Sequence, residues 1–189
     1  MQVDIKKYEK DWEKPSRLPR IEKVIINFGV GKSGPELERA RTLAEALTGR
    51  KPADSRSKDS VRGFAIRKGE PIGCHVTLRG EEGFEFLKKA FYALEDRILT
   101  KNFDKFGNVS VTIHDHLNLP NVKYDPKIGV YGFTVTANLE RFGYRIKRRR
   151  LQRRRVPQRH RVTKEEAIAW YLNNFENLQI EDKFEEDFY

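Results

Sequence analysis

The sequence predicts an α+β fold in which helices pack on one face of a mostly antiparallel sheet. Segments rich in β-forming residues alternate with segments of helical periodicity along most of the chain. Residues 72–79 (IGCHVTLR) alternate polar and apolar side chains, which is the pattern of a strand with one buried face. Helices that cover only one face of such a sheet form an α+β sandwich and leave the other face open.

The first strand is expected at residues 21–28 (IEKVIINF), which contain a short β-branched run. A helix follows, with Ser33 as a possible cap, Pro35 in its first turn and Gly49 as its C-terminal stop. A short strand is expected near Ala53. The helix has apolar residues at helical spacing, namely Leu37, Ala40, Leu43, Ala44 and Leu47.

The second half of the chain continues this alternation. After the strand at residues 72–79, a helix is predicted from residue 81 to about residue 99, because apolar residues recur along one stripe. Two strands should follow at residues 109–113 and 130–139, the second being the longest. Residues 163–166 (TKEE) form a capping box, with Thr at the cap and Glu three positions later, and predict a final helix.

The charge of the chain favours a polyanionic partner. The chain has 38 Lys and Arg against 28 Asp and Glu, which gives a net charge of +10. No segment approaches the roughly 20 apolar residues of a membrane span, and residues 1–20 lack the apolar stretch of a signal peptide. The single Cys74 excludes an internal disulfide and a multi-cysteine zinc site, and it is typical of a reducing cytosol.

Much of the positive charge lies in residues 141–161, which we call the arginine segment. It holds eleven Lys or Arg residues and no acid, whereas residues 176–189 carry six acids against Lys183 alone. A solvated face or a nuclear-import signal would be the alternatives to a nucleic-acid contact. The guanidinium group suits bidentate phosphate contacts. The residues expected to contact phosphates are Arg145, Lys147, Arg148, Arg149, Arg150, Arg153, Arg154, Arg155, Arg159 and Arg161.

A second basic stretch, residues 56–68, is called the basic loop. Its Ser and Gly content and the following Pro71 predict a long, mobile loop without secondary structure of its own. Loops of this length are often functional, although an ordinary connection between two strands is the alternative. Phe64 is apolar and is expected to seek a packing partner. The basic residues of the loop are Arg56, Lys58, Arg62, Arg67 and Lys68.

Two motifs contain residue types that are used in catalytic sites. Residues 29–33 (GVGKS) lie between a strand and a helix, but a P-loop needs Gly five positions before Gly31, where Ile26 stands. His114 and His116 should lie on one face of an extended chain, yet no further metal ligands have suitable spacing. The sequence therefore predicts no enzyme, no metal, no cofactor and no small-molecule substrate.

Four segments together resemble the L-five family of large-subunit ribosomal proteins in its archaeal and eukaryotic form. They occur in family order and span roughly residues 20–175. The chain is accordingly divided into an extension (residues 1–19), a family-like RNA-binding domain (20–175) and an acidic tail (176–189). The matching segments are IEKVIINFGVG, LTGRKPADSRSKDSVRGFAIRKGEPIGCHVTLRG, VKYDPKIGVYGFTV and RHRVTKEEAI.

The resemblance implies a five-stranded sheet and a cytoplasmic protein that anchors 5S rRNA to large-subunit rRNA in the central protuberance. It implies 5S rRNA contacts from Asn27, Thr77 and the position of Arg50, where the family often has Gln. It also implies that the basic loop, including Phe64, reaches P-site tRNA. Further implied partners are neighbouring large-subunit proteins and a head protein of the small subunit.

Two other interpretations stay open at this point. A non-ribosomal regulatory RNA-binding module would share the charge pattern, and a nucleotide-dependent enzyme would use the turn at residues 29–33. Co-sedimentation with large subunits separates the first alternative from the ribosomal one. ATP or GTP turnover separates the second.

Overall fold

A five-stranded antiparallel sheet organises the protein, whose computed structural model describes residues 6–120 and 122–182. The strands lie side by side in the order β2-β3-β1-β6-β5, and every neighbouring pair is antiparallel. The predicted α+β sheet is thus confirmed. The strands are β1 (Pro19–Phe28), β2 (Ala53–Arg56), β3 (Pro71–Leu78), β5 (Val109–Ile113) and β6 (Phe133–Arg141).

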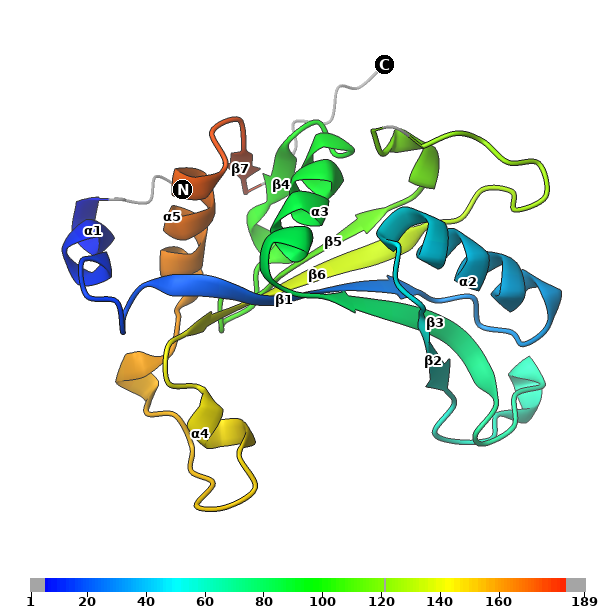
Figure 1. The fold of residues 1–189 in the computed structure, drawn as a ribbon, viewed down its shortest axis with the longest axis horizontal. Coiled ribbons are helices and arrows are strands. Elements are labelled where there is room, and N and C mark those ends of the chain that lie inside the picture. The colour runs from blue at the N-terminus through cyan, green and yellow to red at the C-terminus, as the bar shows by residue number, and fades with distance from the viewer. Residues whose placement is uncertain (1–5, 121, 183–189) are drawn as a thin grey trace.

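The long helices cover one face of this sheet, whereas the short helix Arg145–Arg148 lies on the other side (Figure 1). Val24, Ile26 and Phe28 of β1 are fully buried against the long helices, whereas Asn27 between them is exposed. Phe91 and Tyr171 join two helices in an edge-to-face contact, with ring centroids 6.0 Å apart. The helices are α1 (Lys6–Trp12), α2 (Pro35–Thr48), α3 (Gly80–Tyr92), α4 (Arg145–Arg148) and α5 (Lys164–Asn174).

The predicted ends of α2 are only partly correct. The helix ends at Thr48, and the following Gly49 has a φ of 65°, the left-handed conformation expected of a C-terminal stop. At the other end Gly34 is the cap and contributes no side-chain bond. Ser33 is not the cap, because its hydroxyl donates to the Glu70 carboxylate across the sheet edge. This bond lowers the pKa of Glu70.

The helix predicted to run to about residue 99 ends at Tyr92. Glu95 and Asp96 have φ values of 55° and 57°, which a right-handed helix cannot contain. The next residues form β4 (Arg97–Leu99), which pairs in parallel with β7 (Gln179–Glu181). The apolar stripe of the sequence extends to Ile98 because the Ile98 side chain is also buried, although it belongs to a strand and not to the helix. The strand expected to be longest, β6, has nine residues and β1 has ten.

Both ends of the described chain pack on the helical layer. Trp12 of α1 donates its indole N–H to Glu166 of α5 at 3.3 Å, and Tyr8 donates to Glu165. Strand β7 lies within the predicted acidic tail, but residues 183–189 of that tail lie outside the described residues. No helix in the described part of the chain is long and apolar enough to span a bilayer.

Candidate RNA interface

The centre of the sheet face opposite the long helices carries polar, uncharged side chains, and we call this central part the open face. Alternation along the strands turns these side chains away from the core. Toward α4 the same strands carry the charged residues Lys23 and Glu140. Strand register places Thr112, Thr134, Asn27 and His75 in one row across four strands. The next row is Ser110, Thr136, Ile25 and Thr77, in which Ile25 alone is apolar.

Hydroxyl groups on this face form hydrogen bonds with one another and with His75, and these bonds fix the side chains in place. Ser110 and Thr136 have their Oγ atoms 3.0 Å apart, and the Ser55 hydroxyl lies 3.0 Å from Nδ1 of His75. The side-chain amide of Asn27 has no hydrogen-bond partner within residues 6–120 and 122–182. An exposed amide between two hydroxyl-bearing strands has donors and acceptors free for a ligand.

The structure brings together two of the three residues expected to contact 5S rRNA. Asn27 pairs with His75 in the register, and Thr77 stands two residues further along β3, so both lie on the open face as diagonal neighbours. Arg50 lies beyond the end of α2 and forms an ion pair with Glu82 at 2.7 Å. Glu82 raises the pKa of Arg50. Its charge is therefore partly engaged by α3.

The basic loop has secondary structure, contrary to the prediction. A 3-10 turn (Arg62–Phe64) sits inside an antiparallel bridge between Val61 and Ile66. The base of the loop is closed because Ser57 donates its N–H to Glu70 at 2.9 Å and accepts one from Gly69. Backbone hydrogen bonds within the loop therefore pair N–H and C=O groups of a segment whose composition predicted no secondary structure.

The five cations of the basic loop and Phe64 are exposed. Phe64, expected to find a packing partner, is 75% exposed at the tip. Within the described ranges the five cations of the loop form no ion pair. The loop lies at the β2–β3 end of the sheet, opposite the end that carries α4 (Figure 1). It presents an aromatic ring among unpaired cations, which is a combination that suits bases and phosphates.

Some cations of the arginine segment form ion pairs with acidic residues of the sheet. Arg148 pairs with both Glu22 and Glu140, and Lys147 lies 3.5 Å from Glu140. The hydrogen bond from Arg148 lowers the pKa of Glu22, which keeps that carboxylate ionised. Arg161 instead donates Nε to the Val156 carbonyl at 3.2 Å. These cations hold the segment in place.

The other arginines of the segment stay available. In the part of the chain that the structure describes, they form no ion pair and are exposed, with two exceptions. Arg141 is buried and pairs with Glu166, and the half-buried Arg149 donates to the Gln152 carbonyl. Sequence alone had treated all ten positions alike. The exposed and unpaired members are Arg145, Arg150, Arg153, Arg154, Arg155 and Arg159.

The two motifs with catalytic residue types are structural. His116 is 1% exposed at the start of a 3-10 turn, where Nδ1 accepts the N–H of Tyr131, and burial lowers its pKa. His114 is exposed, so the prediction that both histidines share a face is wrong. No described group of His, Cys, Asp or Glu is placed to hold a metal. Gly31 donates its N–H to the Ile72 carbonyl at 2.7 Å.

Comparison with known families decides what this basic sheet protein is. A model described as ribosomal protein L5 matches residues 14–67. A second model, which describes the C-terminus of the same ribosomal family, matches residues 71–170. The chain belongs to this ribosomal protein family. The predicted resemblance is thereby confirmed.

Three archaeal relatives support the assignment along most of the chain. The large ribosomal subunit protein uL5 of Aeropyrum pernix is 48% identical over 161 residues, 84% of each chain. That of Sulfurisphaera tokodaii is 45% identical over 88% of this chain and 95% of the relative. That of Methanococcus aeolicus is 42% identical over 93% and 99%. The chain is a ribosomal protein of the large subunit rather than an enzyme, and ribosomes of these archaea are cytoplasmic.

Sequence reasoning missed most of the open face. Thr134 and Thr136 of β6 and Ser110 and Thr112 of β5 were not among the candidate contacts. The signal was the alternation of hydroxyl and apolar residues in VSVTI and FTVTA. That pattern identifies a half-buried strand, but only the register shows that the hydroxyls of both strands meet beside Asn27.

Proposed function

We propose that the protein binds 5S rRNA on the open face and anchors it to large-subunit rRNA in the central protuberance. The observation that carries this is an uncharged hydroxyl and amide surface lying between two cationic segments, the basic loop and the arginine segment. Structured RNA is bound largely by shape, through 2′-hydroxyl and phosphate groups. Hydroxyl and amide side chains match the ribose, and arginines match the phosphates.

Replacing Asn27→Ala together with Thr77→Val is expected to weaken 5S rRNA binding by about thirty-fold, since two hydrogen bonds of roughly 1 kcal/mol each are lost. Gel shifts against a length-matched RNA at fixed salt measure this. Thr42→Val is the matched control, because Thr42 lies on α2 and its hydroxyl donates to the Glu38 carbonyl. Equal affinity of the unmodified protein for both RNAs would refute 5S specificity.

The basic loop serves a separate role in the proposal, as the contact to P-site tRNA. Support comes from its exposed cations and from Phe64 at its tip. The Arg62→Ala, Arg67→Ala variant is expected to keep 5S rRNA affinity within about two-fold while impairing tRNA-dependent translation. Arg39→Ala on the exposed side of α2 serves as control. A large loss of 5S affinity in the loop variant would contradict this division.

The unpaired members of the arginine segment supply the phosphate contacts of the proposal. Phosphate neutralisation gives most of the affinity of such complexes and makes it steeply salt-dependent. Neighbouring large-subunit proteins and a head protein of the small subunit complete the proposed set of partners. Crosslinking within intact subunits, resolved to the nucleotide, tests which RNA each arginine meets.

A further inference from the structure

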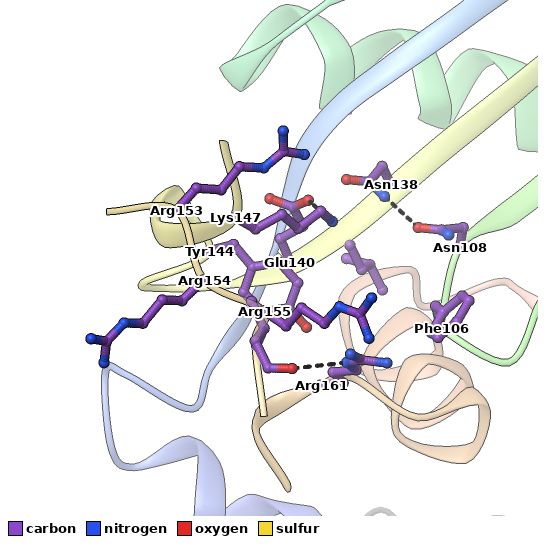
Figure 2. A pocket seen from close by; sticks show the side chains of 12 residues that line it. Phe106, Asn108, Asn138, Glu140, Tyr144, Lys147, Arg153, Arg154, Arg155 and Arg161 are labelled. Atoms are coloured by element: carbon purple, nitrogen blue, oxygen red, sulfur yellow. Dashed lines mark hydrogen bonds and ion pairs between the residues drawn. The ribbon is translucent and has the colours of Figure 1, made fainter. Parts of the chain in front are cut away.

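A cavity of about 490 Å³ lies between the arginine segment, strand β6 and the chain that enters β5 (Figure 2). Phe106 and Asn108 line it from the chain entering β5, Asn138 from β6, and Arg155 and Arg161 from the arginine segment. Pockets that hold small ligands typically measure about 300–1,000 Å³. The cavity is therefore large enough for a single nucleotide.

One wall of the cavity is aromatic and surrounded by cations. The Phe106 ring is 44% exposed, the guanidinium carbon of Arg161 lies 5.9 Å from its centroid, and Lys105 Nζ lies 5.2 Å from it. Arg155 extends into the cavity on the side of Phe106, whereas Arg154 extends away from it (Figure 2). An aromatic ring beside cations is the surface on which an unstacked base and its phosphate both find partners.

The wall beside the Phe106 ring offers hydrogen bonds. Asn138 donates Nδ2 to Oδ1 of Asn108 at 2.5 Å, and Asn108 donates its own Nδ2 to Asp104 at 2.7 Å. Oδ1 of Asn138 is buried and has no partner among residues 6–120 and 122–182. Buried acceptors in proteins almost always have a donor. An amino group on the edge of a base is a donor of the required kind.

The charges of the cavity also favour an anionic ligand. Glu140 is its one acidic wall residue in the part of the chain that the structure describes. That carboxylate already pairs with Arg148 and with Lys147. Arg155, in contrast, forms no ion pair within the described ranges. A phosphate at the mouth thus meets unpaired cations and no unpaired carboxylate.

We infer that this cavity receives one extruded, unpaired nucleotide of the bound RNA. The base stacks on Phe106 with its edge toward Asn138, and the adjoining phosphates lie along Arg153 and Arg154. This inference rests on the proposed RNA-binding function and adds a site that reads an unstacked base.

The test compares single-stranded with duplex RNA. Fluorescence anisotropy measures binding of a labelled adenosine hexamer, and of a duplex with the same number of phosphates, at one salt concentration. Phe106→Ala is expected to bind the hexamer about ten-fold more weakly, as loss of one stacking contact implies, and the duplex within two-fold. Phe106→Tyr keeps the ring and should retain hexamer affinity. Tyr92→Ala removes a 65% exposed ring on α3 and is the matched control.

The outcomes distinguish failure of the cavity site from failure of the proposed RNA-binding function. Equal losses on hexamer and duplex, or no loss on either, would overturn the cavity site. A Tyr92→Ala loss as large as that of Phe106→Ala would overturn it as well. The 5S gel shift judges the proposed function independently, because its variants at Asn27 and Thr77 lie on the open face. Failure of either experiment leaves the other interpretable.

Discussion

Replacing Glu166→Gln is expected to lower the free energy of unfolding by about 3–5 kcal/mol. Glu166 is 2% exposed and pairs with Arg141, which is 7% exposed. The substitution keeps the size of the side chain but leaves the guanidinium as an uncompensated buried charge. Chemical denaturation measures the change directly. For a chain of this length the melting temperature should fall by on the order of 10 °C.

The neighbouring Glu165→Gln variant is the matched control. Its carboxylate is exposed and accepts a bond from Tyr8, so the expected change stays within about 0.5 kcal/mol. The double replacement Arg141→Met with Glu166→Leu should recover most of the lost stability, because burying neither charge removes the desolvation cost. If the Gln variants at 165 and 166 unfold at the same denaturant concentration, the pair contributes little and this argument fails.

The pair also has a consequence for function. Arg141 begins the arginine segment at the end of β6, and Glu166 lies in α5, just beyond the end of that segment. Trp12 donates to the same carboxylate. The two ends of the segment are thus fixed to one another and to α1. This fixes the base of a highly charged segment that would otherwise repel itself.

Glu166 illustrates what sequence could and could not predict. The TKEE pattern predicted the helix start correctly, and Thr163 Oγ1 accepts the N–H of Glu166 at 3.4 Å. A capping box would turn the Glu166 side chain back to the Thr163 N–H. It pairs with Arg141 instead, because a buried guanidinium offers a stronger, charge-assisted bond. Local pattern identifies a cap, but a partner 25 residues away depends on the packing of the fold.

The candidate site divides in the same way. Alternation and helical spacing predicted all five strands of the sheet and the start of α3, whereas the left-handed residues 95 and 96 left no pattern. The arginine segment was evident from composition. Its division into paired and unpaired cations was not, because Glu22 approaches Arg148 across 126 positions of sequence. Which charges remain for RNA is therefore a property of the folded chain.

Neutralising three unpaired arginines, Arg150→Gln, Arg153→Gln and Arg154→Gln, is expected to reduce the salt dependence of rRNA binding. Each lost phosphate contact lowers the slope of log affinity against log salt by about 0.7–0.9, so the slope should fall by about two. The three side chains are exposed and form no ion pair in the described parts of the chain. Stability should change little as a result. Binding to deproteinised large-subunit rRNA across a salt series gives the slope.

The control removes the same charge from the helical side of the molecule. Arg39→Gln, Lys88→Gln and Lys89→Gln lie exposed on α2 and α3, which cover the opposite face of the sheet. If net charge alone drives binding, both triple variants lower the slope equally, and the arginine segment has no special role. If the segment contacts phosphates directly, only its own variant lowers the slope, since released counterions count local contacts. Lys147 and Arg148 are unsuitable for this comparison, because acids already hold them to the sheet.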